Sequence, residues 1–98
     1  LHAYLVDPSV ETVLDASIEH GEANSILNLP PRKIQEILDR FRAIIGAHDG
    51  PIVALTGSSN RYFLRQITEG SIANLTVLSH SEIPPGVRVL AQGVIRAN

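Results

Sequence analysis

Apolar and polar residues alternate along this chain with two periods, one typical of strands and the other of helices. Residues 2–6 follow the two-residue period and predict a strand. Asp7-Pro8 then predicts a helix start, because Asp can accept bonds from free helix amides and Pro at the first helical position loses no hydrogen bond. The apolar residues within 10–18 recur at helical spacing, and Gly21 is expected to end this helix.

The clearest amphipathic pattern belongs to a second helix in the middle of the chain. Residues 25–29 are a short strand candidate, which Pro30-Pro31 ends while opening the helix. Apolar residues then recur at helical spacing over residues 34–45. Glu36 and Arg40 lie four residues apart on the expected solvent side, where we expect them to form an ion pair.

A third helix is expected after the most apolar strand of the sequence. Residues 52–55 form a continuous apolar run between turn signals, which is typical of a strand buried on both faces. The small polar residues 57–60 predict a turn that carries helix-capping side chains. The helix itself is expected from about Asn60 to Glu69.

The last part of the chain predicts two more strands, over residues 75–78 and 87–95. Between them, the two prolines of residues 82–86 predict a rigid turn in which Ile83 points inward. The order β-α-β-α-β-α-β-β predicts an α/β fold, with a mixed sheet and helices packed against it in a small single domain over residues 1–98. The last two strands are able to form an antiparallel pair at one edge.

The helical and strand periods converge on one hydrophobic core. The chain has 98 residues, of which 44% are apolar, and this length allows one modest core. The expected core residues are Val10, Leu14, Ile18, Ile37, Leu38, Phe41, Val53, Leu55, Phe63, Ile67, Val77 and Val89.

Composition excludes several classes of function. The absence of cysteine excludes disulfides, thiolate chemistry and cysteine-based zinc sites. The longest apolar runs are too short to span a bilayer, and the net charge of −2 argues against a nucleic-acid partner. Because the chain begins with Leu1 and not with Met, we expect it to be a piece of a longer protein.

Acidic residues are concentrated at the start of the chain. Residues 1–30 contain five acidic and no Lys or Arg residues, whereas residues 31–98 contain eight basic and five acidic ones. The spacing predicts that Glu11, Asp15 and Glu19 lie on one face of the first helix. We interpret this acidic stripe either as a solvated face that aids solubility or as a contact for a basic partner surface.

The turn before the third helix occupies the position where phosphate-binding loops occur, between a buried strand and a helix. A Walker loop is excluded because the Gly-Lys-Ser/Thr sequence is missing. The simpler interpretation is a capped helix start. The alternative is a stand-alone regulatory domain that is phosphorylated on Ser58 or Ser59.

Neither catalytic nor metal-binding patterns stand out among the polar residues. The four histidines are far apart in sequence and lack the spacing of metal ligands, so no metal or cofactor is expected. A small enzyme that uses His80 and Glu82 is a further alternative. Neighbouring residues on a strand alternate faces, however, and do not converge as a catalytic triad must.

Two arginines on the third helix are candidate partner-binding residues. Arg61 and Arg65 lie four residues apart and share one helix face. They either form a solvated surface with an Arg65–Glu69 pair or present a fork that binds a carboxylate of another subdomain. Glu82 is a sixth candidate beside the acidic stripe and these arginines, and it is expected to pair with Arg61 or Arg65.

Three segments together resemble one protein family. Residues 77–85 read VLSHSEIPP and are followed by the alternating residues 87–89. This stretch resembles the segment "VLS-x-x-EIP" of the large export-gate protein of bacterial type III secretion, the FHIPEP family, which includes flagellar FlhA and its virulence homologues. Two other segments are also similar to that family. One is the apolar strand of residues 51–56 followed by the "R-x-x-L" of residues 61–64, and the other is the "P-x-x-E" helix start at residues 8–11.

The resemblance spans almost the whole chain, with departures at His80 and at residues 57–59. It implies that the chain is the fourth, C-terminal cytosolic subdomain of a parent protein whose N-terminal half lies in the bacterial inner membrane. It implies a non-enzymatic docking and assembly role at the cytoplasmic face of that membrane. The implied partners are other subdomains and copies of the parent protein in a ring, together with export chaperone–substrate complexes.

Overall fold

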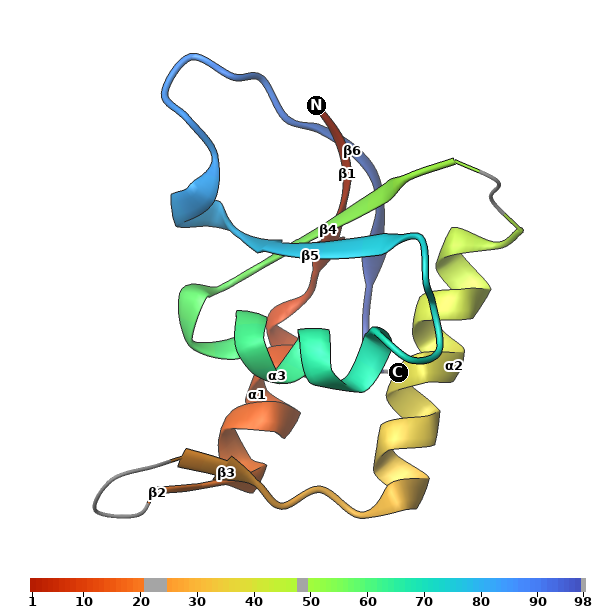
Figure 1. Cartoon of the computed structure of the whole chain (residues 1–98), viewed down its shortest axis with the longest axis vertical. Coiled ribbons are helices and arrows are strands. Elements are labelled where there is room, and N and C mark those ends of the chain that lie inside the picture. The colour runs from red at the N-terminus through yellow and green to blue at the C-terminus, as the bar shows by residue number, and fades with distance from the viewer. Residues whose placement is uncertain (21–24, 48–49, 98) are drawn as a thin grey trace.

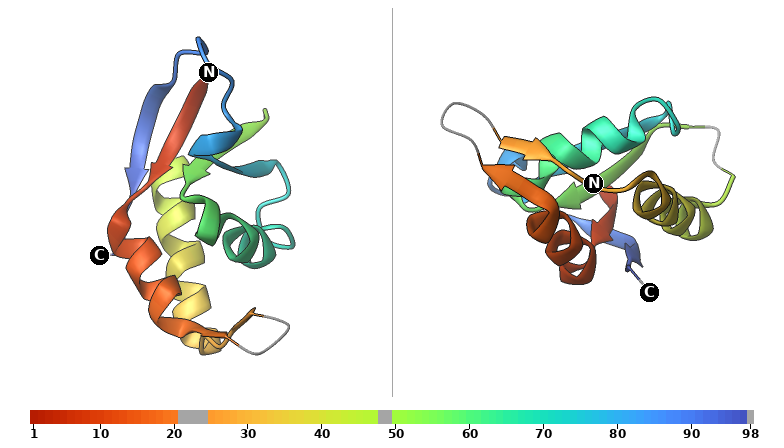
Figure 2. Two further views of the ribbon diagram at one scale, coloured as in Figure 1. Left: turned by 90° about the vertical axis from the view of Figure 1, so that its left-hand side faces the viewer. Right: turned by 90° about the horizontal axis from the view of Figure 1, so that it is seen from below.

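A parallel sheet organises the protein, and the computed structural model describes residues 1–20, 25–47 and 50–97. Within this part the main sheet has the order β5-β4-β1-β6, and every neighbouring pair of strands is parallel (Figure 1). Its strands are β1 (His2–Val6), β4 (Ile52–Thr56), β5 (Leu75–Ser79) and β6 (Leu90–Ile95). A separate antiparallel hairpin consists of β2 (Ile18–His20) and β3 (Ser25–Leu27) and lies apart from the main sheet (Figure 2).

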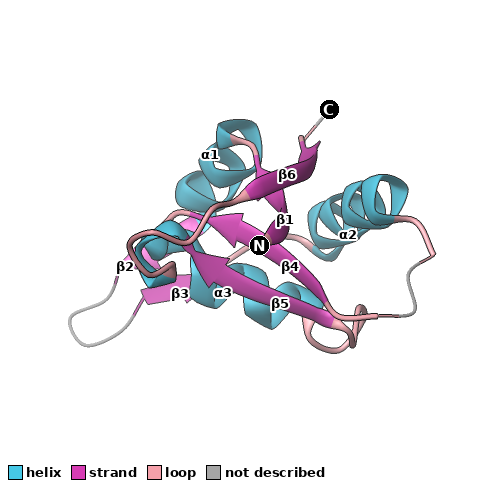
Figure 3. Cartoon of the chain, turned by 90° about the horizontal axis from the view of Figure 1, so that it is seen from above, coloured by secondary structure: helices cyan, strands magenta, loops and turns pink. Residues whose placement is uncertain are grey.

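Three helices pack against one face of the sheet. They are α1 (Pro8–Ser17), α2 (Pro31–Ile45) and α3 (Ser58–Thr68). Seen from above, α3 lies behind β4 and β5 (Figure 3). The short 3-10 helix η1 (His80–Glu82) follows β5, and His80 lines a hollow together with Leu5 and Val94. Leu5 and Val94 alternate along their strands with residues that face the helices, so their side chains lie on the other face of the sheet. The connection from β5 to β6 therefore crosses that other face.

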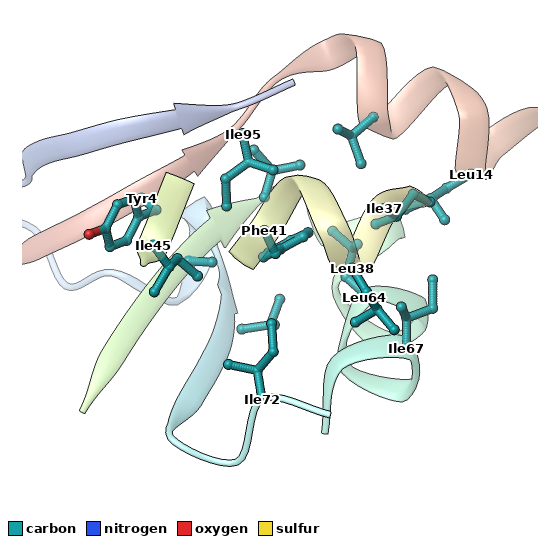
Figure 4. Close-up of a cluster of buried hydrophobic side chains, with 14 of the residues drawn as sticks. Tyr4, Leu14, Ile37, Leu38, Phe41, Ile45, Leu64, Ile67, Ile72 and Ile95 are labelled. Carbon is teal, nitrogen blue, oxygen red and sulfur yellow. The ribbon is translucent and has the colours of Figure 1, made fainter. Parts of the chain in front are cut away.

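The core fills the space between the helices and the sheet (Figure 4). Each helix contributes side chains that are fully buried there, and Leu14, Phe41 and Leu64 are each 0% exposed. Strand residues such as Tyr4 and Ile95 face them from the sheet. The amphipathic pattern of the second helix therefore predicts most of its buried face, but Ile44 of that pattern is 38% exposed.

Most of the expected core is confirmed. Nine of the expected residues are buried: Val10, Leu14, Ile37, Leu38, Phe41, Leu55, Phe63, Ile67 and Val77. Ile18 and Val53 are partly buried. The placement of Val89 in the core is wrong, because β6 begins only at Leu90 and Val89 lies in the preceding connection, 38% exposed.

The first helix ends earlier than its apolar spacing predicts. Asp7 caps it as expected, since the Asp7 carboxylate accepts a bond of 2.9 Å from the Ser9 amide. The helix stops at Ser17, because the next three residues are extended and pair with β3. That pairing supplies backbone hydrogen bonds which a further helical turn would otherwise have provided. Gly21, the expected end of the helix, lies outside the described residues.

The last strand also differs from expectation. β5 and β6 lie at opposite edges of the sheet, so the antiparallel pair is wrong, and β6 instead runs parallel to β1. The connection between them turns at residues 84–87, where the Val87 amide donates to the Pro84 carbonyl and Gly86 has a φ of 86°. Proline followed by a residue with positive φ is the pattern of a type II turn. The Leu90 amide then bonds to the Leu1 carbonyl at 2.7 Å, which places β6 beside β1.

We predict that Phe41→Ala lowers the free energy of unfolding by about 3–5 kcal/mol, because it leaves a large cavity in a region with no exposure. The measurement is equilibrium unfolding in denaturant. Ile44→Ala on the same helix is the control, and its cost should be less than half as large because Ile44 is 38% exposed. A loss below about 1 kcal/mol for Phe41→Ala would show that α2 packs by another face.

Candidate functional site

A carboxylate from α1 binds the N-terminal end of α3. The Oε2 atom of Glu11 accepts hydrogen bonds from the Thr56 hydroxyl at 2.7 Å and from the Gly57 amide at 2.6 Å. Gly57 is the N-cap of α3 and has no side chain that could cap the helix. A Cβ atom at this position would lie 3.1 Å from Oε2 of Glu11, so glycine permits the close approach. α1 and the β4–α3 turn are thereby joined.

A second carboxylate of the acidic stripe reaches the same helix end. Oδ1 of Asp15 accepts a hydrogen bond of 2.9 Å from the side-chain amide of Asn60, which is only 3% exposed. Glu11 and Asp15 are one helical turn apart, and both therefore bind groups at the start of α3. Negative charge is favourable there because the N-terminal end of a helix carries partial positive charge.

Glu19 does not belong to the acidic helix face. It lies in β2, where its Oε1 atom accepts a bond of 2.8 Å from the side-chain amide of Asn28. The stripe expected from the four-residue spacing is therefore wrong at Glu19, because the helix ends two residues before it. Asp15 and Glu19 are both exposed, whereas Glu11 is partly buried.

The partners of these carboxylates could not be identified from spacing along the first helix. Thr56, Gly57 and Asn60 lie more than forty residues away in sequence. The available signal is the polar Thr56 at the end of an otherwise apolar strand, followed by small polar residues at a helix start. That signal indicates an anion at the helix end, and the anion is the protein's own Glu11.

The occupied helix end argues against regulation by phosphoserine. Ser58 and Ser59 are exposed in the first turn of α3, which begins at Ser58 and not near Asn60. The expected capping side chains are wrong, because the N-cap is Gly57 and no side chain of residues 57–60 caps the helix. The carboxylate of Glu11 already binds the Gly57 amide beside them. A phosphate added here would meet a like charge, and such placement disrupts structure by repulsion.

Glu82 joins η1 to α3. Its Oε1 atom forms an ion pair with Nε of Arg61, which confirms the expected pairing. The same oxygen accepts bonds from the Ser79 amide at 2.9 Å and the Ser79 hydroxyl at 3.2 Å, and this arrangement caps η1. The Ser79 amide holds the pKa of Glu82 below its ordinary value of 4.5, against the raising effect of burial. The Ser79 hydroxyl and Arg61 assist it.

Arg65 forms the pair expected of a solvated surface. Its Nε atom lies 3.7 Å from Oε2 of Glu69, and both side chains are more than half exposed. Arg61 and Arg65 border a hollow between α3 and β5 that measures about 350 Å³. With Arg61 bound to Glu82 and Arg65 beside Glu69, this surface is no open fork for a carboxylate.

The His80–Glu82 pair lacks the geometry of a catalytic site. His80 is exposed, and the bonded oxygen of Glu82 is directed to Ser79 and Arg61. Across residues 1–20, 25–47 and 50–97, no three acidic or histidine side chains are grouped closely enough to bind a metal. His48 lies outside these ranges. In the same ranges no helix combines the length and the apolar character needed to cross a membrane.

Comparison with known proteins places the chain in one family. The model of the FHIPEP family matches residues 1–88. Protein hrpC2 of Xanthomonas euvesicatoria is 27% identical over 90 residues, which is 91% of this chain and 14% of that protein.

Solved structures share the fold over nearly the whole chain. CdsV of Chlamydia pneumoniae is 31% identical, with a TM-score of 0.89 over 98% of this chain and 28% of that one. CdsV in complex with CdsO gives a TM-score of 0.87 at 30% identity, covering 98% and 29% of the two chains. Nonameric SctV-C of EPEC gives 0.85 at 26% identity, covering 97% and 29%.

This chain therefore spans less than a third of the structures that it matches and about a seventh of the curated relative. The resemblance that residues 77–85 indicate is confirmed by the family match and by the fold. The chain belongs to the FHIPEP family of type III secretion export-gate proteins, and it corresponds to their C-terminal cytosolic subdomain.

Proposed function

We propose that this chain is a non-enzymatic docking and assembly subdomain of a type III export gate. The observation that carries the proposal is the match of 98% of the chain to CdsV, with a TM-score of 0.89. The polar side chains that could have been catalytic, His80 and Glu82, support this view, because Glu82 is engaged in capping η1 and pairing with Arg61.

The proposed partners follow from what the relatives assemble with. SctV-C is nonameric, and CdsV forms a complex with CdsO. By analogy, the parent of this chain assembles into a ring of copies at the cytoplasmic face of the inner membrane. The subdomain contacts neighbouring subdomains and helps to receive chaperone–substrate complexes.

We divide the candidate partner-binding residues into two groups by the role of their bonds within the chain. Glu11, Arg61 and Glu82 bind groups of their own chain and hold the surface in shape. Asp15, Glu19 and Arg65 also have partners in the chain, namely Asn60, Asn28 and Glu69, but all three are exposed and carry charge that another protein can reach. We assign docking to the second group, because rim charges orient and accelerate encounter between proteins.

We predict that Asp15→Lys with Glu19→Lys, made in the longer export-gate protein, lowers secretion while circular dichroism of this chain stays unchanged. Reversing two exposed charges repels a basic partner surface, although it also removes the bonds from Asn60 to Asp15 and from Asn28 to Glu19. The loss of secretion should diminish as ionic strength rises. Secreted substrate in the culture medium is the readout.

The matched control for this charge reversal is Asp39→Lys, which changes an exposed carboxylate on α2. It should leave secretion close to that of the unmodified protein. Normal secretion by the Asp15 and Glu19 double variant would leave the acidic residues with a solubility role only.

A second prediction concerns the pH dependence of η1. The folded-state pKa of Glu82 is below its ordinary value of 4.5, so its carboxylate contributes stability that is fully present above pH 4.5. That contribution is lost as the pH falls through the lower, folded-state pKa. Equilibrium unfolding of the unmodified chain and of Glu82→Gln should therefore differ most near neutral pH and converge on acidification.

Asp7 also has a lowered pKa, chiefly through hydrogen bonds from Ser9, but it is present in both proteins and cancels in the comparison. A stability difference that stays constant down to about pH 3 would contradict the assigned role of Glu82.

A further inference from the structure

A small hollow lies between α1 and α2, outside the acidic and arginine surfaces described above. Its apolar lining includes Val10 and Val13 of α1 and Ile37 of α2, and its volume is about 110 Å³. Residues 96–97 line it where the chain leaves β6. We call this feature the α1–α2 groove.

Hydrogen bonds to both helices fix the wall at residues 96–97. The Ala97 amide donates to the Ser9 hydroxyl of α1 at 3.0 Å. From the other side, Nε of Arg40 on α2 donates to the Arg96 carbonyl at 3.1 Å. Arg40 is thus engaged with Arg96 and not with Glu36, the partner that helix spacing predicts. The groove is consequently built from fixed elements on three sides.

Positive charge predominates among the residues that line the groove. Lys33, Arg40 and Arg96 oppose the single carboxylate of Glu36, which gives a net charge of +2 by this count. Nζ of Lys33 lies 3.4 Å from Glu36. Arg96 takes part in none of the ion pairs found among the described residues, and its charge helps to lower the pKa of Asp7. When the carboxylate of Asp7 is included, the net charge of these residues is +1.

We propose that the α1–α2 groove binds an acidic segment of a partner protein, with one aliphatic side chain of that segment inserted between the helices. An apolar cavity of about 150 Å³ accepts a benzene ring, so the smaller groove fits Val or Leu better than an aromatic residue. Arg40 and Arg96 present guanidinium groups, which bind carboxylates in a planar, two-pronged geometry. A segment with one apolar side chain between carboxylates is therefore chemically complementary to the groove.

This proposal deepens the docking function proposed above and rests on it, but the groove is a different surface from Asp15, Glu19 and Arg65. Peptide binding tests the groove, and secretion tests the function. The two proposals can consequently fail separately.

The probe is a synthetic capped peptide of about twelve residues whose central Leu is flanked by Glu residues, a length that one groove can engage in a helical or extended form. Matched peptides carry Gln for Glu, or Ala for the central Leu. Binding to the full chain is followed by fluorescence anisotropy, and its location is found from amide chemical shifts.

We expect saturable binding of the acidic Leu peptide, with the largest shifts at Val13, Ile37 and Arg96. Lys33→Glu with Arg96→Glu should weaken binding by about tenfold or more, as loss of complementary charge does. Arg32→Glu is the matched control. It reverses the neighbouring charge, which is 83% exposed and outside the groove lining, and should change affinity by less than about twofold.

Several results would overturn the proposal. Among them are no saturable binding at about 1 mM peptide, equal binding of the Gln or Ala peptide, and equal weakening by Arg32→Glu. Shifts at the same amides that depend on protein concentration without peptide would assign the groove to a second copy of the chain instead. If the Lys33→Glu and Arg96→Glu double variant loses peptide binding while secretion stays normal, the groove is still a peptide-binding site, but the export function does not depend on it.

Discussion

The free amides at the start of α3 impose the constraint on which much of this structure depends. The helix follows directly from the buried end of β4, and its N-cap is Gly57, which offers no capping side chain. Buried backbone donors must find partners. Glu11 supplies one by reaching across from α1, and the same oxygen also binds the Thr56 hydroxyl. One carboxylate thus fixes α1, β4 and α3 relative to one another.

That constraint changes the meaning of the negative charge in the first thirty residues. A row of carboxylates on a helix normally indicates a solvated face, and like charges at this spacing weaken a helix. Here Glu11 and Asp15 are stabilised by donors near the positive end of α3. Among the other described acidic residues of this region, Asp7 caps α1 and Glu19 accepts a bond from Asn28. The α1–α2 groove, in contrast, carries the positive charge of Lys33, Arg40 and Arg96.

Periodicity predicts the local elements well because their causes are local. The start of α1 follows from Asp7-Pro8, and the buried face of α2 follows from its apolar spacing. The strand over residues 52–55 is buried because its run is apolar throughout, with Val53 the only partly buried member.

Pairings between distant residues could not be read in this way. The end of α1 at Ser17 depends on pairing with residues 25–27, and the parallel placement of β6 depends on the path of residues 80–89. The candidate site shows the same division. The Arg65–Glu69 pair follows from helix spacing, whereas the bond from Asn60 to Asp15 joins residues 45 positions apart.

The central claim is that Glu11 completes the N-terminal end of α3, and amide hydrogen exchange at Gly57 tests it most directly. The account predicts that the Gly57 amide exchanges slowly in the unmodified chain. In Glu11→Ala it should exchange much faster, while the amide of Leu55 within β4 keeps its protection. An unprotected Gly57 amide in the unmodified chain, or protection that survives Glu11→Ala, would contradict the account.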